Sequence, residues 1–233
     1  MKKIALLGHK GFLGSRISKH LENNSNCIVQ NIDRATFNSR KFDEKVDYVI
    51  NSAMPSARFW AESNPNLDFI ETVEKTNNII REFSESKIIQ ISSISAKTQL
   101  HKVYGRNKKA AESLLDLNEN LIYRLGPLYG DGLSKGVIVD LINNNDVYVA
   151  GESQYAFTNI DWVAKKIIEN LDLNGLVELG SSGHVKLSDL KSFLSSESKF
   201  VGEIDNQVFD DYFENTPPAT DVYHYASKLK NNI

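Results

Sequence analysis

The feature that most constrains this chain is a short apolar run, residues 4–7, that breaks into three glycines spaced three apart, Gly8, Gly11 and Gly14. The run predicts a buried strand, and the residues after it have the apolar spacing of an amphipathic helix. Glycines at such a turn let the backbone approach a ligand closely, and the helix directs free N–H groups and its positive dipole end toward it. The pattern predicts a pyrophosphate site; an ordinary glycine-rich turn is the alternative.

A second predicted strand, Cys27–Ile32, ends at Asp33, nineteen residues after Gly14. A dinucleotide-binding βαβ unit places a carboxylate at about this distance, where it accepts hydrogen bonds from the adenosine ribose. Like-charge repulsion between Asp33 and a 2′-phosphate would favour NAD over NADP. The positive charges of Lys10 and Arg34 would attract a 2′-phosphate, so NADP remains the alternative cofactor. A solvated loop aspartate is the other reading of Asp33.

Strands and helices alternate over the first 125 residues. Because alternation of this kind produces a parallel sheet with right-handed crossovers, we expect a doubly wound α/β fold of the Rossmann type. The small residues Ser52 and Ala53 follow one strand at the edge of the sheet where ligands bind. Further strands are predicted at 46–50, 87–91 and 120–125, and helices at 66–83 and 103–116.

The pattern loosens after residue 126. We expect a small C-terminal portion, interleaved with the end of the sheet, and Asp161 as the N-cap of one of its helices. The tail beyond residue 195 has no assignable pattern. The predicted elements here are helices at 137–142, 161–171 and 188–193 and strands at 147–150 and 176–179.

Composition limits the possible partners. The 27 Lys and Arg against 30 Asp and Glu give a net charge of −3, so no basic field favours nucleic acid or an anionic membrane. No segment approaches the roughly 20 apolar residues that span a bilayer, and the apolar stretch after Met1 is too short for a signal peptide.

The single cysteine, Cys27, suits a reducing cytoplasm and is interpreted as a buried structural thiol. The five histidines lack metal-ligand spacing, so we expect no metal.

Tyr104 and Lys108 lie four apart at the start of a predicted helix, so they share one face. A lysine ammonium beside a phenol lowers the pKa of the phenol, and a nearby serine hydroxyl can bind the same substrate oxygen. With the Ser92-Ser93 pair at the end of the preceding strand, the group could move a proton at an alcohol while a hydride moves at the same carbon. His101 could act as a second acid or base, or simply belong to the loop.

In their order and context these motifs resemble the extended short-chain dehydrogenase/reductases, and more narrowly the NAD-dependent epimerase/dehydratase family that acts on nucleotide-linked sugars. The resemblance covers residues 1–194. It rests on Gly8-x-x-Gly11-x-x-Gly14, Asp33, Asn51-Ser52-Ala53, Ser92-Ser93, Tyr104-x-x-x-Lys108 and the segment from Arg124 to Gly130.

The resemblance implies a Rossmann domain at 1–126 and a reduced substrate-binding portion at 127–233. It implies Ser93 as the catalytic serine, Tyr104 as the acid/base, and Lys108 as the residue that binds the nicotinamide ribose. It also implies a homodimer in which helices 66–83 and 103–116 pack against their copies. The implied cofactor-binding residues are Gly8, Lys10, Gly11, Phe12, Leu13, Gly14, Asp33, Arg34, Ser52, Ala53, Tyr104 and Lys108.

Departures from the family pattern narrow the reaction. Sugar dehydratases follow the catalytic serine or threonine with an Asp-Glu pair, and Ile94 and Ser95 stand there instead, which disfavours a dehydratase. Residues 72–76 lack the family's Asn-Val-x-Gly-Thr, so its local helix distortion is not implied. We expect an NAD(P)-dependent oxidoreductase or epimerase acting on a secondary alcohol or ketone of a nucleotide-activated sugar. A catalytically silent NAD(P)-binding sensor and a reductase of a non-sugar ketone are the alternatives.

Overall fold

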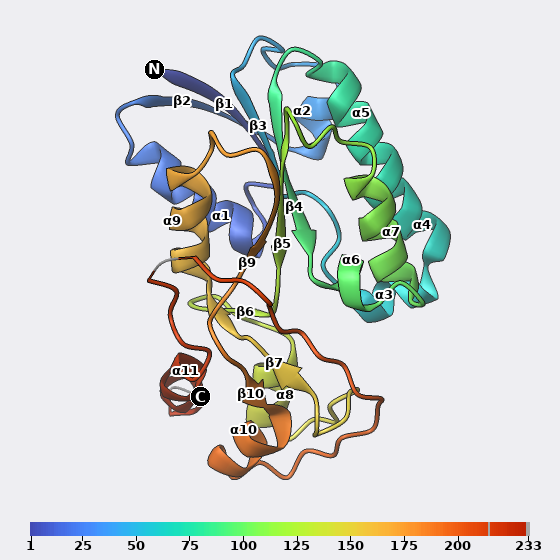
Figure 1. Ribbon diagram of the computed structural model, residues 1–233, viewed down its shortest axis with the longest axis vertical. Coiled ribbons are helices and arrows are strands. Elements are labelled where there is room, and N and C mark those ends of the chain that lie inside the picture. Colours follow the sequence, from blue (N-terminus) through green and yellow to red (C-terminus); the bar gives the residue numbers. More distant parts are fainter. Residues whose placement is uncertain (214, 232–233) are drawn as a thin grey trace. The chain divides into compact units, whose positions relative to one another are not determined.

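The computed structural model describes residues 1–213 and 215–231 (Figure 1). The chain divides into two compact units. Unit 1 comprises Met1–Leu125 and Ala164–Val177, and unit 2 comprises Gly126–Val163 and Glu178–Ile233. The chain therefore leaves unit 1, returns to it for one short segment, and leaves it again.

Unit 1 is built on a six-stranded sheet with the order β2-β1-β3-β4-β5-β9. The pairs β1/β2, β1/β3, β3/β4 and β4/β5 are parallel, which confirms the predicted parallel sheet. Strand order reverses at β1, because β2 lies on one side of it and β3 on the other. The strands are β1 (Lys2–Leu7), β2 (Cys27–Ile32), β3 (Tyr48–Asn51), β4 (Lys87–Ser93), β5 (Leu121–Leu125) and β9 (Gly175–Leu179).

Helices cover both faces of this sheet, as the doubly wound prediction requires. Figure 1 shows α1 and α9 on one face and α4, α5 and α7 on the other. All five residues of β5 are buried, the pattern expected of a strand covered on both sides. The helices are α1 (Phe12–Glu22), α2 (Arg34–Asn38), α3 (Arg58–Ser63), α4 (Pro65–Phe69), α5 (Lys75–Glu82), α6 (Ser95–Thr98), α7 (Val103–Glu112) and α9 (Ile160–Glu169).

The long helix predicted at 66–83 is divided by a π-helical segment, η1 (Ile70–Glu74), which joins α4 to α5. The helix distortion that the missing Asn-Val-x-Gly-Thr put in doubt is therefore present. A π turn adds a residue to the helical repeat and often lies at a functional site. Glu71, which belongs to this segment, lines the cavity described below.

The strands that lie wholly in unit 2 are only two residues long. The unit packs around its own apolar cluster, which includes Tyr155, Phe157 and Leu190. The strand predicted at 147–150 is absent as a strand, because Val147 makes only a single bridge to Phe200. Helix α11 was missed in the sequence. The elements are β6 (Leu128–Tyr129), α8 (Val137–Ile142), β7 (Gln154–Tyr155), β8 (Thr158–Asn159), β10 (Val185–Lys186), α10 (Leu187–Phe193) and α11 (Asp221–Lys230).

Two local predictions need correction. The side chain of Asn159 accepts hydrogen bonds from the N–H groups of Asp161 and Trp162, at 2.9 and 3.1 Å, so Asn159 rather than Asp161 caps α9. Cys27, expected to be buried, is partly exposed at the start of strand β2, which forms an edge of the sheet.

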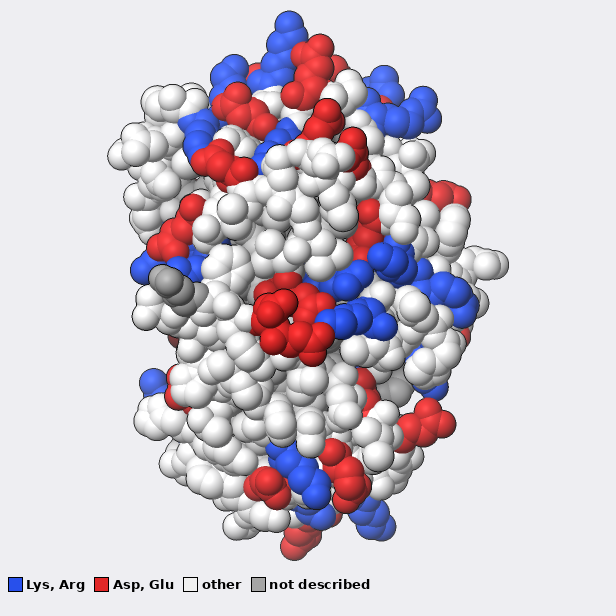
Figure 2. All heavy atoms as spheres, in the orientation of Figure 1, with Lys and Arg blue, Asp and Glu red and all other residues white. Residues whose placement is uncertain are grey.

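Acidic and basic side chains lie next to one another on the face drawn in Figure 2, in keeping with the small net charge of the chain. Within residues 1–213 and 215–231, no helix has the length and apolar character needed to span a membrane.

Candidate functional site

The glycine turn after β1 has the close backbone approach that its sequence predicts. Gly8 has a φ of +83°, and a Cβ added there would lie 2.5 Å from the carbonyl oxygen of Ser52. A Cβ on Gly14 would collide with the carbonyl oxygen of Gly8. Helix α1 begins behind Gly11 without a side-chain cap and without an acidic residue in its first turn. Its first N–H groups are thus suited to an anion.

A cavity of about 430 Å³ opens at the ends of β1, β2 and β3 in unit 1. This is where strand order reverses, the usual place for a ligand in an open α/β sheet. Of the predicted cofactor residues, the cavity is lined by Gly8, Lys10, Gly11, Asp33, Arg34, Ser52 and Ala53. Phe12, Leu13 and Gly14 lie instead in the first turn of α1, outside its lining.

The opposite wall of the cavity was missed in the sequence. It comes from η1 and α5, and its polar residues are Glu71, Glu74, Lys75 and Asn78. No local motif marks these residues, because they reach the cavity through the fold of a distant helix. The available signal was their spacing of three, one and three residues, which places all four on one face of the helix predicted at 66–83.

Asp33 caps a helix and binds a lysine, two contacts that neither interpretation of its sequence included. One carboxylate oxygen caps α2 by accepting hydrogen bonds from the N–H and hydroxyl of Thr36, both at 2.9 Å. The other oxygen lies 3.0 Å from the Lys10 ammonium. The hydrogen bonds from Thr36 and then the contact with Lys10 hold the pKa of Asp33 well below its usual range. Asp33 is therefore a carboxylate at the rim of the cavity.

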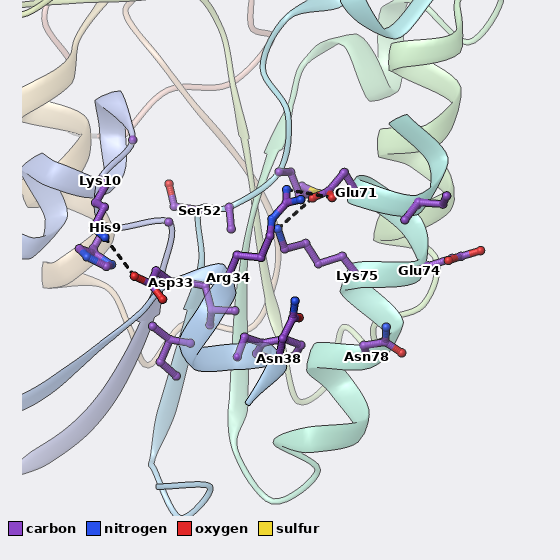
Figure 3. Close-up of a pocket in the computed structure, with 18 residues that line it drawn as sticks. His9, Lys10, Asp33, Arg34, Asn38, Ser52, Glu71, Glu74, Lys75 and Asn78 are labelled. Carbon is purple, nitrogen blue, oxygen red and sulfur yellow. Dashed lines mark hydrogen bonds and ion pairs between the residues drawn. The ribbon is translucent and has the colours of Figure 1, made fainter. Parts of the chain in front are cut away.

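Two further cations lining the cavity are bound to one carboxylate. Figure 3 shows Arg34 extending from α2 to Glu71, at 2.9 Å, where Lys75 also lies at 3.1 Å. This ion triplet joins α2 to η1 and α5. The guanidinium group of Arg34 accordingly lies beside Glu71 rather than beside Asp33 (Figure 3).

Ser93, Tyr104 and Lys108 come together in unit 1, at the end of β4 and the start of α7. Ser93 lies close enough to the Tyr104 hydroxyl to act on its pKa, and the Lys108 ammonium lies 5.2 Å from the centre of the Tyr104 ring. Gly105 permits this placement, since a Cβ there would lie 2.5 Å from the carbonyl oxygen of Ser95. None of the three predicted catalytic residues lines the 430 Å³ cavity.

Burial is the largest cause of the pKa shifts of Tyr104 and Lys108. It raises the pKa of Tyr104 to about 12, while the side chain of Ser93 and the charge of Arg58 act in the opposite direction. Burial likewise lowers the pKa of Lys108 to about 7, against the attraction of Asp68 and Glu112. The sequence had suggested that Lys108 lowers the pKa of Tyr104. In the structure the net shift of Tyr104 is upward.

Asp68 is a buried residue of α4 that no sequence motif marked. One of its carboxylate oxygens accepts a hydrogen bond from the Asn107 amide at 2.9 Å, and the other is buried with no hydrogen-bond partner among the described residues. Its charge acts on both Tyr104 and Lys108. A carboxylate beneath the lysine favours the ammonium form.

A buried ion pair fixes the far end of α7. Arg124 on β5 donates to both carboxylate oxygens of Glu112, at 2.9 and 2.6 Å, and the Ser92 hydroxyl donates to one of them at 2.7 Å. All three residues are buried. This network ties the helix that carries Tyr104 to strands β4 and β5.

His101 lies exposed in the turn before α7. Across residues 1–213 and 215–231, no three His, Cys, Asp or Glu side chains gather as they would around a metal ion.

Stability should rise with pH because of Lys108. Its pKa is about 7 in the folded chain against 10.5 in the unfolded one, so the unfolded chain binds more protons between these values. We expect the free energy of unfolding to increase by about 2 kcal/mol between about pH 7 and 9. Urea unfolding of Lys108→Met should lack this rise, while the exposed control Lys41→Met should keep it. An equal rise in Lys108→Met would contradict the assignment.

No protein-family model matches the chain, and no curated protein matches its sequence. Among solved structures, UDP-N-acetylglucosamine 4-epimerase from Methanobrevibacter ruminantium superposes with a TM-score of 0.78 at 16% identity, covering 99% of this chain and 97% of that one. The dTDP-4-dehydrorhamnose reductase from Clostridium acetobutylicum gives 0.75 at 18% identity, covering 98% and 99%.

UDP-glucuronic acid 4-epimerase from Bacillus cereus, solved with UDP-glucuronic acid and NAD, gives a TM-score of 0.77 at 19% identity and covers 97% of this chain and 99% of that one. The similarity extends over nearly the whole of each chain. At these identities it establishes a shared fold, the Rossmann-type α/β fold expected from the sequence.

Proposed function

We propose that this protein is an NAD-dependent epimerase or reductase of the extended short-chain dehydrogenase/reductase family, acting at a secondary alcohol or ketone of a nucleotide-activated sugar. The observation that carries the proposal is that one unit holds both the glycine-lined cavity and the buried Ser93, Tyr104 and Lys108. Structures with the same fold are epimerases and a reductase of UDP- and dTDP-sugars, and one of them holds NAD.

The residues of the cavity fit NAD. The absence of a Cβ at Gly8 and Gly14 leaves the backbone turn tight, and the start of α1 offers N–H groups for a pyrophosphate. Asp33 stands at the rim with a carboxylate for the ribose hydroxyls. When bound, NAD would supply the site that accepts and returns a hydride.

The residues of α7 would handle the proton. The Tyr104 hydroxyl would give a proton to the substrate oxygen or take one from it, and the Ser93 hydroxyl would hold that oxygen by a hydrogen bond. Lys108, with a pKa of about 7, can exchange its own proton near neutral pH. Burial of Tyr104 limits the access of water to its hydroxyl.

We further propose a homodimer in the cytoplasm. Leu67, Phe69 and Ile70, on α4 and η1, are apolar yet about half exposed. An apolar face of this kind is suited to packing against its copy in a second subunit.

A screen of nucleotide sugars tests the reaction. The protein, loaded with NAD or NADH, is mixed with UDP-, dTDP-, GDP- and CDP-sugars, and the absorbance of the reduced nicotinamide and the products are followed. A change of sugar without net change of NADH identifies an epimerase, and stoichiometric consumption identifies a reductase. NAD binding with no turnover of any sugar would favour a sensor or a non-sugar substrate instead.

Asp33 should set the preference for NAD. In Asp33→Asn the amide oxygen can still cap α2, while the negative charge beside a 2′-phosphate is lost. We expect the ratio of the Kd values for NADP and NAD to fall by about tenfold, the effect of one unfavourable charge contact in a partly exposed site. Calorimetric titration with both dinucleotides measures it. A ratio that does not move would show that Asp33 serves only as the cap.

A further inference from the structure

Every lysine and arginine among the described residues that line the cavity is held by a carboxylate. Lys10 lies 3.0 Å from Asp33, and Arg34 and Lys75 lie 2.9 and 3.1 Å from Glu71. A 2′-phosphate binds to a dinucleotide site through cations near the ribose carboxylate. In this chain those cations already have partners.

We propose that Glu71 determines cofactor specificity together with Asp33, by withholding Arg34 from the 2′-phosphate of NADP. This inference rests on the proposed dinucleotide site. Arg34 follows Asp33 directly in the chain, so its guanidinium group is within reach of the ribose position. Figure 3 shows it turned away, to Glu71 on the opposite wall.

The surroundings of Glu71 favour its ion pair with Arg34. Its side chain is 23% exposed and that of Lys75 is 19% exposed, so the carboxylate is partly desolvated and bound by two cations. The Arg34 side chain is 70% exposed and can turn readily once released. Glu71 also adds its own negative charge to the wall that faces the ribose side, which disfavours a phosphate dianion.

The chain offers a matched control on the same wall. Glu74 also lines the cavity, is exposed, and lies one helical turn from Glu71. Glu74→Gln changes the charge of the cavity by the same amount as Glu71→Gln without releasing Arg34 from its ion pair. A difference between the two variants therefore reports the ion pair rather than net charge.

The test measures Kd for NAD and NADP by calorimetric titration of the full chain. In Glu71→Gln we expect NADP to bind about five- to tenfold tighter and NAD to change by less than about twofold. Glu74→Gln should give a much smaller gain. The increase in NADP affinity should disappear in Glu71→Gln/Arg34→Gln. In Glu71→Gln/Asp33→Asn, the free energies of the two single increases in NADP affinity should add.

The outcomes separate this inference from the proposed function. A wild-type protein that binds neither dinucleotide would overturn the proposed cofactor and this inference with it. If the wild-type protein binds NAD, and Glu71→Gln leaves the ratio of the Kd values for NADP and NAD within about twofold of wild type, the inference alone is overturned. A gain in NADP affinity that survives the removal of Arg34, or one that Glu74→Gln reproduces in full, would also overturn it.

Discussion

Tyr104→Phe is expected to lower kcat by a factor on the order of 10² to 10⁴ while leaving NAD affinity and folding nearly unchanged. The substitution keeps the buried ring, which packs under the Lys108 ammonium, and removes only the oxygen that would carry the proton. Single-turnover hydride transfer with the sugar found in the screen measures the effect without the contribution of product release.

Tyr123→Phe provides the matched control. Tyr123 is a fully buried tyrosine of β5 in the same unit, and its hydroxyl donates a long hydrogen bond, 3.4 Å, to the carbonyl oxygen of Asn170. We expect its rate to stay close to wild type. A Tyr104→Phe protein with a near wild-type rate would show that another group moves the proton, and His101 would be the first to test.

Glu112→Ala should destabilise the fold by about 3–5 kcal/mol, because it leaves the guanidinium of Arg124 buried without its carboxylate. That loss is a large fraction of the roughly 5–15 kcal/mol by which a folded protein is stable. The midpoint of urea unfolding measures it. Glu119→Ala, an exposed glutamate shortly after α7, should cost little.

A double variant separates a lost pair from lost packing. Glu112→Met/Arg124→Met removes both charges and keeps apolar volume, so it should recover much of the stability lost in Glu112→Ala. A loss of less than about 0.5 kcal/mol in Glu112→Ala would contradict the role given to this pair. Equal loss in the single and double variants would assign the effect to packing instead.

The sequence was sufficient for the elements that are marked by continuous burial. Strand β2 begins and ends where it was predicted, and β1, β3, β4 and β5 differ from their predicted bounds by a few residues, because apolar runs between glycines and polar clusters are strong local signals. Helices α2, α3 and α6 are four to six residues long, too short to show a helical period. The position of such helices is fixed by tertiary contacts.

The candidate site was predictable on one wall only. The residues around Gly8, Asp33 and Ser52 follow strands, and the ends of parallel strands must meet at one edge of the sheet. Glu71 reaches the same cavity from a helix whose rotation about its axis is set by the π turn, which no residue pattern indicated. The titration of Lys108 was also beyond the sequence, since it depends on how deeply the side chain is buried.

The return of the chain to unit 1 has a consequence for how the protein is made. Strand β9, which pairs with β5, leaves the ribosome only after the first segment of unit 2, Gly126–Val163, has been synthesised. Until then β5 is an open edge of the sheet, and its free backbone groups can pair with another nascent chain. Polypeptides that terminate before Gly175 keep this edge permanently, so we expect them to aggregate more readily than the full chain.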